Sequence, residues 1–215
     1  MHDDHYIYNP TPTGKMRFGR TEIRHIAIAL GVLTLAFAIV LTRIITDVHD
    51  MDLMISFLYA LGMSFVVVTT GFFLHEMGHK IVAQKYGAWA EFRIFPFGLI
   101  MALAFSFAGF IIAAPGAVYI QGIATRRENG LISIAGPAIN LIIGIPFLLI
   151  SYFIPISSIL GLFIYLMAFV NALLAFFNLL PIPPMDGSKI YRWNAPIYAV
   201  IFTVSIVFLA VTYLG

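Results

Sequence analysis

The chain has 215 residues, about the length of one domain, and contains no cysteine. Hydrophobic residues make up 61% of it and charged residues only 10%, whereas a soluble domain carries about 25% charge, so the sequence predicts an integral membrane protein. The formal net charge of +2 is too small to suggest nucleic acid as a partner, and the lack of cysteine excludes disulfides and thiolate metal ligands. Any metal site must therefore use histidine, aspartate or glutamate.

A polar N-terminal segment precedes the first apolar one. Residues 1–25 begin with the cluster His2-Asp3-Asp4-His5, and four basic residues follow it. Such a terminal cluster either binds a metal or belongs to a disordered tail, which is the usual case. We interpret residues 1–25 as a cytoplasmic tail and residues 26–215 as a membrane-embedded core. Since further apolar segments follow Ile26–Thr42, we expect that segment to be an anchoring span rather than a cleavable signal peptide.

The second apolar segment, residues 53–85, contains a metal-binding pattern near its end. This pattern is His75-Glu76-Met77-Gly78-His79, and residues four apart lie on the same face of a helix. Both imidazoles can therefore bind one metal ion, while Glu76 stands beside the first of them as a candidate general base. Ionisable side chains inside a bilayer are rare and usually functional. The pattern thus predicts a metal site within the membrane.

The stretch Ile94–Ala124 has no charged residue in 31 positions, but it contains four glycines and two prolines. Two helical crossings need about 40 residues, so the stretch is too short for them. If it does not cross the membrane, eleven of the twelve Lys and Arg residues lie on one side, with Arg43 as the exception. The five spans are then 26–45, 53–85, 131–153, 158–180 and 196–214, with the N-terminus in the cytoplasm.

We therefore expect an all-α polytopic membrane protein with a small membrane-associated strand or hairpin insertion around residues 91–122. The aromatic and β-branched side chains of Glu91–Phe97 favour a strand. The alternative is a single crossing at residues 97–114, which would give six transmembrane helices instead of five. In hydrocarbon the strands must pair with each other and be covered by protein, because unpaired backbone groups are costly there.

Two polar patterns follow in the third and fourth spans. Gly136-Pro137 lies near the cytoplasmic end of the third span, and Asn140 comes three residues later as a polar group that needs partners. Asn140 either bonds a neighbouring helix or serves the metal site. The fourth span ends at a proline-rich break, after which Asp186 and Gly187 follow. An aspartate on such a turn is usually a turn residue, but the two histidines still lack a third ligand.

Together these residues resemble the site-2 protease family of intramembrane zinc metalloproteases. The resemblance rests on three motifs in the family's order, namely His75-Glu76-x-x-His79, Gly136-Pro137-x-x-Asn140 and Asn178-x-x-Pro181-x-x-x-x-Asp186-Gly187. It implies one zinc ion per chain, held by His75, His79 and Asp186, with Glu76 as general base. Family members often carry a PDZ or CBS domain, and this chain resembles the catalytic core without either.

The same resemblance implies that a membrane-spanning protein is cleaved near its cytoplasmic end, with Asn140 and Asn178 helping to hold the substrate or the transition state. A transmembrane helix hides its carbonyl groups in its own hydrogen bonds, so the substrate must unwind locally before cleavage. We expect an exposed strand edge near Phe92–Phe97 to capture the unwound segment by strand addition. The expected partners are thus a membrane protein and the lipid bilayer.

Two other classes of function are compatible with a His-His-Asp site in a membrane. One is a metal transporter, which would not need a glutamate beside a metal ligand. The other is a scaffold that zinc stabilises without catalysis, although the intact Glu76 argues against it. Replacement of Glu76 by Gln separates the three classes, because only a protease should lose its function and still hold the metal.

Overall fold

The structure, a computed structural model, describes residues 16–123 and 125–214. The predicted His2–His5 cluster and the first fifteen residues of the predicted tail lie outside the described residues. Within them the chain forms helices α1 (Arg20–His49), α2 (Leu53–Val68), α3 (Leu74–Lys85), α4 (Pro96–Phe107), α5 (Arg126–Ser151), α6 (Ile159–Asn178), α7 (Asp186–Trp193) and α8 (Ala195–Leu214). A five-residue π-helix, η1 (Thr69–Phe73), joins α2 to α3, and strands β1 (Trp89–Ile94) and β2 (Gly116–Gln121) flank α4.

Among the described residues, five helices are long and apolar enough to cross a membrane, as we expect of a multi-pass membrane protein. They are Arg20–His49, Leu53–Lys85, Arg126–Ser151, Ile159–Asn178 and Ala195–Leu214. The second is the continuous run of α2, η1 and α3. The first begins within the predicted tail and ends at His49, so residues 46–49, which lie between the predicted spans 26–45 and 53–85, are helical. Asp52 then caps α2 by accepting from the Met54 and Ile55 backbone N–H groups.

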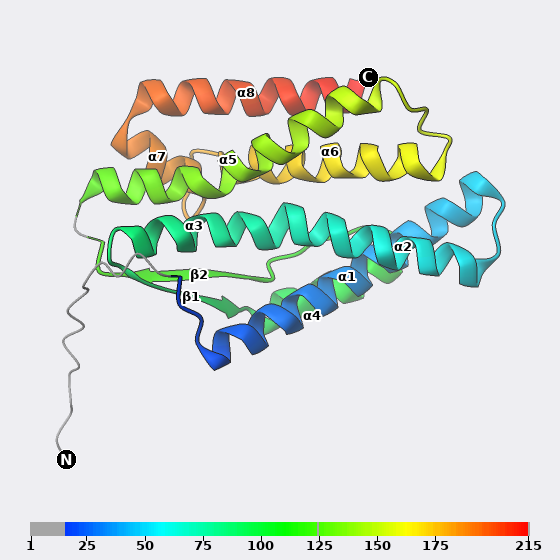
Figure 1. Cartoon of the computed structure of the whole chain (residues 1–215), viewed down its shortest axis with the longest axis horizontal. Helices are drawn as coiled ribbons and strands as arrows, with labels where there is room; N and C mark the ends of the chain where they lie inside the picture. Colours follow the sequence, from blue (N-terminus) through cyan, green and yellow to red (C-terminus); the bar gives the residue numbers. More distant parts are fainter. Residues whose placement is uncertain (1–15, 124, 215) are drawn as a thin grey trace, which may run out of the picture.

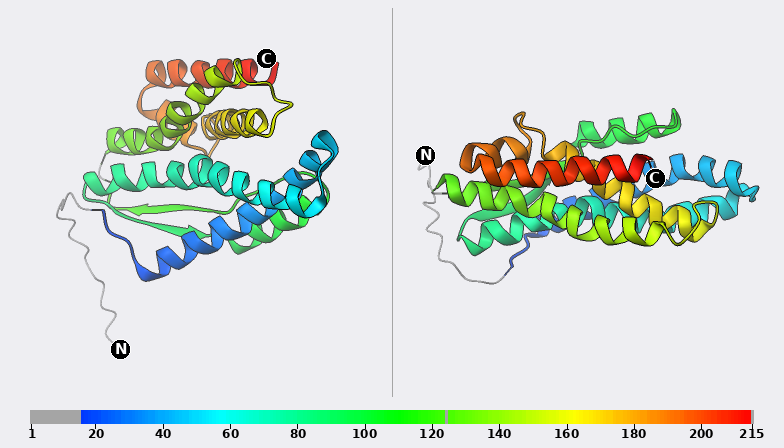
Figure 2. Two further views of the ribbon diagram at one scale, coloured as in Figure 1. Left: turned by 45° about the vertical axis from the view of Figure 1, so that its right-hand side comes forward. Right: turned by 90° about the horizontal axis from the view of Figure 1, so that it is seen from above.

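Helix α3 lies at the centre of the molecule (Figure 1). The two strands, α1 and α4 lie on one side of it, and α5, α6, α7 and α8 lie on the other, as the turned views also show (Figure 2). Side chains of α1 and α4 share a core with β1, in which Leu33, Phe92 and Leu99 are buried. A helix placed between two packed layers can present different faces to each, so α3 carries one set of side chains toward the sheet and another toward α5.

The predicted hairpin around residues 91–122 is confirmed, with one difference. Strands β1 and β2 pair antiparallel, and Phe92 lies opposite Val118. The residues between them begin with helix α4, however, rather than continuing as strand. Three of the four glycines that we counted against a helix come after α4 ends, and Pro96 occupies its first turn, where proline is well tolerated. With 12 residues, α4 is too short to span a bilayer alone.

Helix α4 runs along α1 as far as Arg43, whose Nη2 donates to the Phe107 carbonyl over 2.9 Å. Arg43 lies 23 residues beyond the start of α1, about 35 Å along that helix. The insertion therefore extends much deeper than we expected, and the chain then returns to pair Gln121 with Trp89. Our length argument assumed helices in both directions, whereas extended chain covers about 3.3 Å per residue and returns in few residues.

Lys80, which lies within the predicted second span, is one of the eleven basic residues that the charge count placed on one side of the membrane. Its side chain is fully buried, and its ammonium group bonds both carboxylate oxygens of Glu22 over 2.7 and 2.8 Å. A charged side chain that is buried in this way carries no information about membrane sidedness, because it is paired inside the protein.

Candidate metal centre

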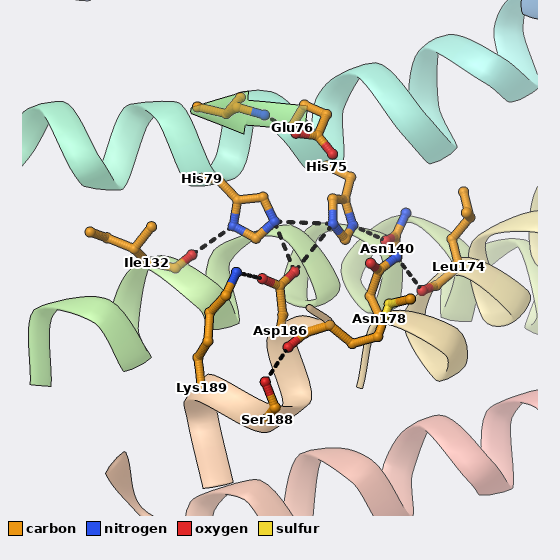
Figure 3. A network of polar contacts seen from close by, with 12 residues as sticks. His75, Glu76, His79, Ile132, Asn140, Leu174, Asn178, Asp186, Ser188 and Lys189 are labelled. Atoms are coloured by element: carbon orange, nitrogen blue, oxygen red, sulfur yellow. Dashed lines mark hydrogen bonds and ion pairs between the residues drawn. The ribbon is translucent and has the colours of Figure 1, made fainter. Parts of the chain in front are cut away.

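The two histidines of the HExxH pattern project from one face of α3, as their spacing predicts (Figure 3). Their Nε2 atoms are 3.1 Å apart. Oδ2 of Asp186 lies 3.0 Å from Nε2 of His79 and 3.6 Å from that of His75. The three side chains are buried, and their ligand atoms all lie within 4.8 Å of one another. The structure thus brings together the three predicted ligands from α3 and α7.

Asp186 is the first residue of α7 rather than a turn residue. The chain returns to the site because Gly187 packs directly on the end of α6, where a Cβ would lie 2.1 Å from the Leu179 carbonyl oxygen. Burial alone raises the pKa of Asp186, but the two histidines, when they carry a second proton on Nε2, and the charge of Lys189 outweigh it and hold this pKa below its usual range. The carboxylate is therefore ionised and available as a ligand at neutral pH.

The outer ring nitrogens of both histidines are held by acceptors. Nδ1 of His79 donates to the Ile132 carbonyl over 2.8 Å, and Nδ1 of His75 donates to Oδ1 of Asn140 over 2.6 Å. With the proton on Nδ1, each neutral imidazole turns a bare Nε2 lone pair toward the Asp186 carboxylate. Three lone-pair donors that face one another at these distances repel unless a cation lies between them. The donor set, two nitrogens and one carboxylate oxygen, fits zinc with a position left for water.

The orientation of Asn140 follows from its other partners. Its Nδ2 group donates to the Gly71 carbonyl over 2.8 Å and to Oδ1 of Asn171 over 3.0 Å, so its oxygen must face His75. Asn171 in turn donates to the Met167 carbonyl over 2.8 Å. Both asparagines are fully buried. Of our two interpretations of Asn140, the structure therefore supports both at once, since it bonds a neighbouring helix and a predicted metal ligand.

Asn171 is a site residue that the sequence analysis missed. It lies in an apolar helix and has no fixed spacing to another motif, so its only signal was the presence of an amide in a buried span. The π-helix η1 was missed as well. It directly precedes α3 and supplies the Gly71 carbonyl to Asn140, and such single-turn bulges are frequent at functional sites.

Gly136 brings α5 close to the two imidazoles. A Cβ at this position would lie 2.4 Å from Nε2 of His79 and 2.5 Å from Nε2 of His75. The atoms that lie closest to this glycine are thus the Nε2 atoms of two predicted metal ligands. Any larger residue would place carbon atoms against the two Nε2 atoms that we predict as metal ligands.

Glu76 lies between α3 and the sheet. Its Oε2 accepts from the Val118 backbone N–H over 2.8 Å, and its side chain is buried. Val118 lies opposite Phe92, whose own N–H points the other way, to Glu22. The N–H of Val118 therefore points away from β1. Glu76 thus lies beside the outer edge of β2, the edge that does not pair with β1.

Asn178 lies at the end of α6, and its Nδ2 donates to the Leu174 carbonyl over 2.9 Å (Figure 3). This bond joins two residues of α6, whereas Asn140 forms a hydrogen bond with a predicted metal ligand, His75. The role that the resemblance implies for Asn178 thus stays a prediction.

Comparison with known proteins agrees with these observations. The profile of "Peptidase family M50" matches residues 156–197, a segment that includes Asn178 and Asp186. The "Putative zinc metalloprotease MJ0611" of Methanocaldococcus jannaschii is 41% identical over 143 residues, which cover 64% of this chain and 73% of that protein. The "Putative zinc metalloprotease YwhC" of Bacillus subtilis is 34% identical over 157 residues, which cover 62% of this chain and 70% of that protein.

A second relative from Methanocaldococcus jannaschii, "Zinc metalloprotease MJ0392", is 31% identical over 128 residues. The match covers 60% of this chain but only 33% of that protein. No solved structure gives a significant match.

Proposed function

The chain belongs to peptidase family M50, the site-2 protease family of zinc metalloproteases, and we propose that it cleaves membrane-spanning proteins near the cytoplasmic side of the membrane. It is thus a membrane-embedded peptide hydrolase that uses zinc. One observation carries the proposal: in a chain with five helices long enough to cross a membrane, three buried ligand atoms lie within 4.8 Å of one another. A peptidase site enclosed by such helices acts on substrates that enter from the bilayer.

We propose that His75, His79 and Asp186 bind one zinc ion per chain. When bound, zinc lowers the pKa of a coordinated water and polarises the scissile carbonyl. Glu76 would accept a proton from the water that adds to the scissile carbonyl carbon, and would donate it to the leaving amine as the C–N bond breaks. Its hydrogen bond to Val118 fixes the carboxylate at the edge of β2, where a substrate backbone can lie next to it.

We propose different roles for the two asparagines. The oxygen and both amide hydrogens of Asn140 are already used, by His75, Gly71 and Asn171, so Asn140 supports the site through His75. Asn178 keeps a free amide oxygen in its bond with Leu174, and we propose that it assists the substrate, as the family resemblance implies.

The edge that we propose for substrate capture differs from the one expected from the sequence. Glu22 and Lys80 occupy the outer edge of β1 at Phe92 and Ala90, so this edge is closed where we expected it to be open. On the outer edge of β2, Glu76 accepts from the Val118 N–H, and the Ile120 N–H two residues further along also points away from β1. We therefore propose that the unwound substrate pairs with β2.

The test uses purified protein, single-span substrates and a chelator. The parent should cleave at least one substrate, and removal of zinc should abolish the cleavage. Glu76→Gln should keep its zinc and lose about 10²–10⁴-fold in turnover, because general acid–base catalysis contributes that much. Near-parental turnover would remove Glu76 from its role as base, and metal transport without cleavage would favour the transporter.

A further inference from the structure

We infer that the buried Glu22–Lys80 pair positions the sheet for the reaction: it closes the outer edge of β1 and fixes the sheet against α3, so that β2 presents its outer edge at Glu76. Glu22 and Lys80 would thus be positioning residues, which act through the sheet and touch neither substrate nor metal. The inference rests on the proposed capture of substrate by β2.

The pair is fully enclosed, and both side chains have 0% of their surface exposed. The ammonium group of Lys80 donates to both carboxylate oxygens of Glu22 and, over 2.8 Å, to the Ala90 carbonyl. Oε1 of Glu22 also accepts from the Phe92 N–H over 3.0 Å, and Oε2 accepts from the Gly19 N–H over 3.2 Å. All three donors of the ammonium are thus used, and one ion pair connects α1, α3 and β1.

Two backbone groups on the outer edge of β1, the Ala90 carbonyl and the Phe92 N–H, form hydrogen bonds with this pair. The Phe92 N–H bonds Glu22, while the Val118 N–H, directly across the sheet, bonds Glu76. Two glutamates, one from α1 and one from α3, therefore accept hydrogen bonds from the two opposite edges of the sheet, at residues that face each other across the strand pair. A shift of β1 along or away from α3 would displace Val118 from Glu76, because the two strands move together.

The segment before α1 extends this closure. The ring of Phe18 lies 4.7 Å from the Lys80 ammonium, so it covers the pair from outside. The Arg17 N–H donates to Oε1 of Gln84, and Nε2 of Gln84 donates to the Arg17 carbonyl. Residues 17–19 thus pack against α3 and help to bury the ion pair.

The chemistry explains why a charged pair occupies this place. An apolar pair of similar volume would pack as well and is often no less stable than a buried ion pair. It would, however, leave the Phe92 N–H without a partner and the Ala90 carbonyl with only the long 3.4 Å bond from Nε2 of Gln84, which is costly in a membrane-embedded protein. It would also leave a second strand edge open, and an open edge is a template for pairing with another chain.

The experiment replaces the pair as a whole, in Glu22→Leu with Lys80→Met, so that no unpaired charge is buried. A second variant, Glu22→Lys with Lys80→Glu, keeps the charges balanced but cannot accept from Phe92 or donate to Ala90. Zinc content, hydrogen exchange of residues 89–94, and kcat and KM on a single-span substrate are measured. We expect both variants to retain zinc, to exchange the β1 amides faster, and to lose about 10–100-fold in kcat, since a displacement of about 1 Å can cost this much.

The matched control is Glu91→Gln, which removes the ion pair with Arg93 on the same strand but leaves the outer edge unchanged. It should exchange and cleave like the parent. Parental kcat in either double variant, or parental protection of its β1 amides, would overturn the inference. A parent without peptidase activity would instead overturn the proposed function, while the exchange of the β1 amides would still report whether the pair closes that edge.

Discussion

At the scale of single residues, the site depends on a series of amides whose orientations are fixed one after another. The Met167 carbonyl fixes Asn171, Asn171 and Gly71 fix Asn140, and Asn140 fixes the proton of His75 on Nδ1. Each step has only one arrangement, because backbone carbonyls accept and never donate. The orientation of Nε2 of His75, which we propose as a zinc ligand, is thus controlled from a neighbouring helix.

We predict that Asn171→Ala lowers the affinity for zinc by about 10–100-fold, because it frees Asn140 to turn away from His75. Titration of the purified variant with zinc against a competing chelator measures the effect. Ser205→Ala is the control, since Ser205 is also fully buried but bonds only its own helix, at Phe202. Equal zinc affinities for both variants would show that the orientation of Asn140 does not depend on Asn171.

A second prediction concerns the glycine beside the imidazoles. Gly136→Ala should prevent zinc binding while the helices stay folded, because the added methyl group would lie 2.4–2.5 Å from both Nε2 atoms. Metal analysis and circular dichroism of the purified variant measure both properties. Gly62→Ala on α2 is the control, since a Cβ there meets nothing within 4 Å. Full zinc content in Gly136→Ala would mean that α5 can retreat from the histidines.

At the scale of elements, spacing within one helix could be predicted and pairing between distant segments could not. The HExxH pattern placed His75 and His79 on one face because an α-helix has a fixed period. The pair of Glu22 and Lys80 joins residues 58 positions apart, and no periodicity links them. The choice of strand edge failed for the same reason, since the register of Phe92 with Val118 decides which N–H groups point outward.

The register now allows a sharp prediction for β2. Ile120 lies opposite Ala90, two residues from Val118, so its N–H also points away from β1. Ile120→Pro should leave the pairing of the strands intact but remove one donor from the outer edge. Cleavage of a membrane-spanning substrate should fall while zinc content stays the same. Ile120→Ala controls for the loss of the side chain, and parental cleavage by the proline variant would contradict capture at this edge.

At the scale of the whole molecule, the charges that suggested the topology have different roles in the structure. Lys80 is buried with Glu22, which leaves ten of the twelve basic residues on the predicted cytoplasmic side. Arg43, the exception, bonds the Phe107 carbonyl at the C-terminal end of α4, where a cation also interacts favourably with the helix dipole. Its presence at the far end of α1 thus has a structural reason and does not weaken the charge argument.

We therefore predict five crossings, with the N-terminus in the cytoplasm and residue 214 on the opposite side. The insertion of β1, α4 and β2 returns to the side where it began, because Trp89 pairs with Gln121. The chain has no cysteine, so single cysteines placed at the exposed positions Asp50 and Arg127 report sidedness without background labelling. In intact cells an impermeant maleimide should modify Asp50→Cys but not Arg127→Cys until the membrane is permeabilised. Labelling of Arg127→Cys from outside would mean that the insertion crosses the membrane, which would invert every helix from α5 onward.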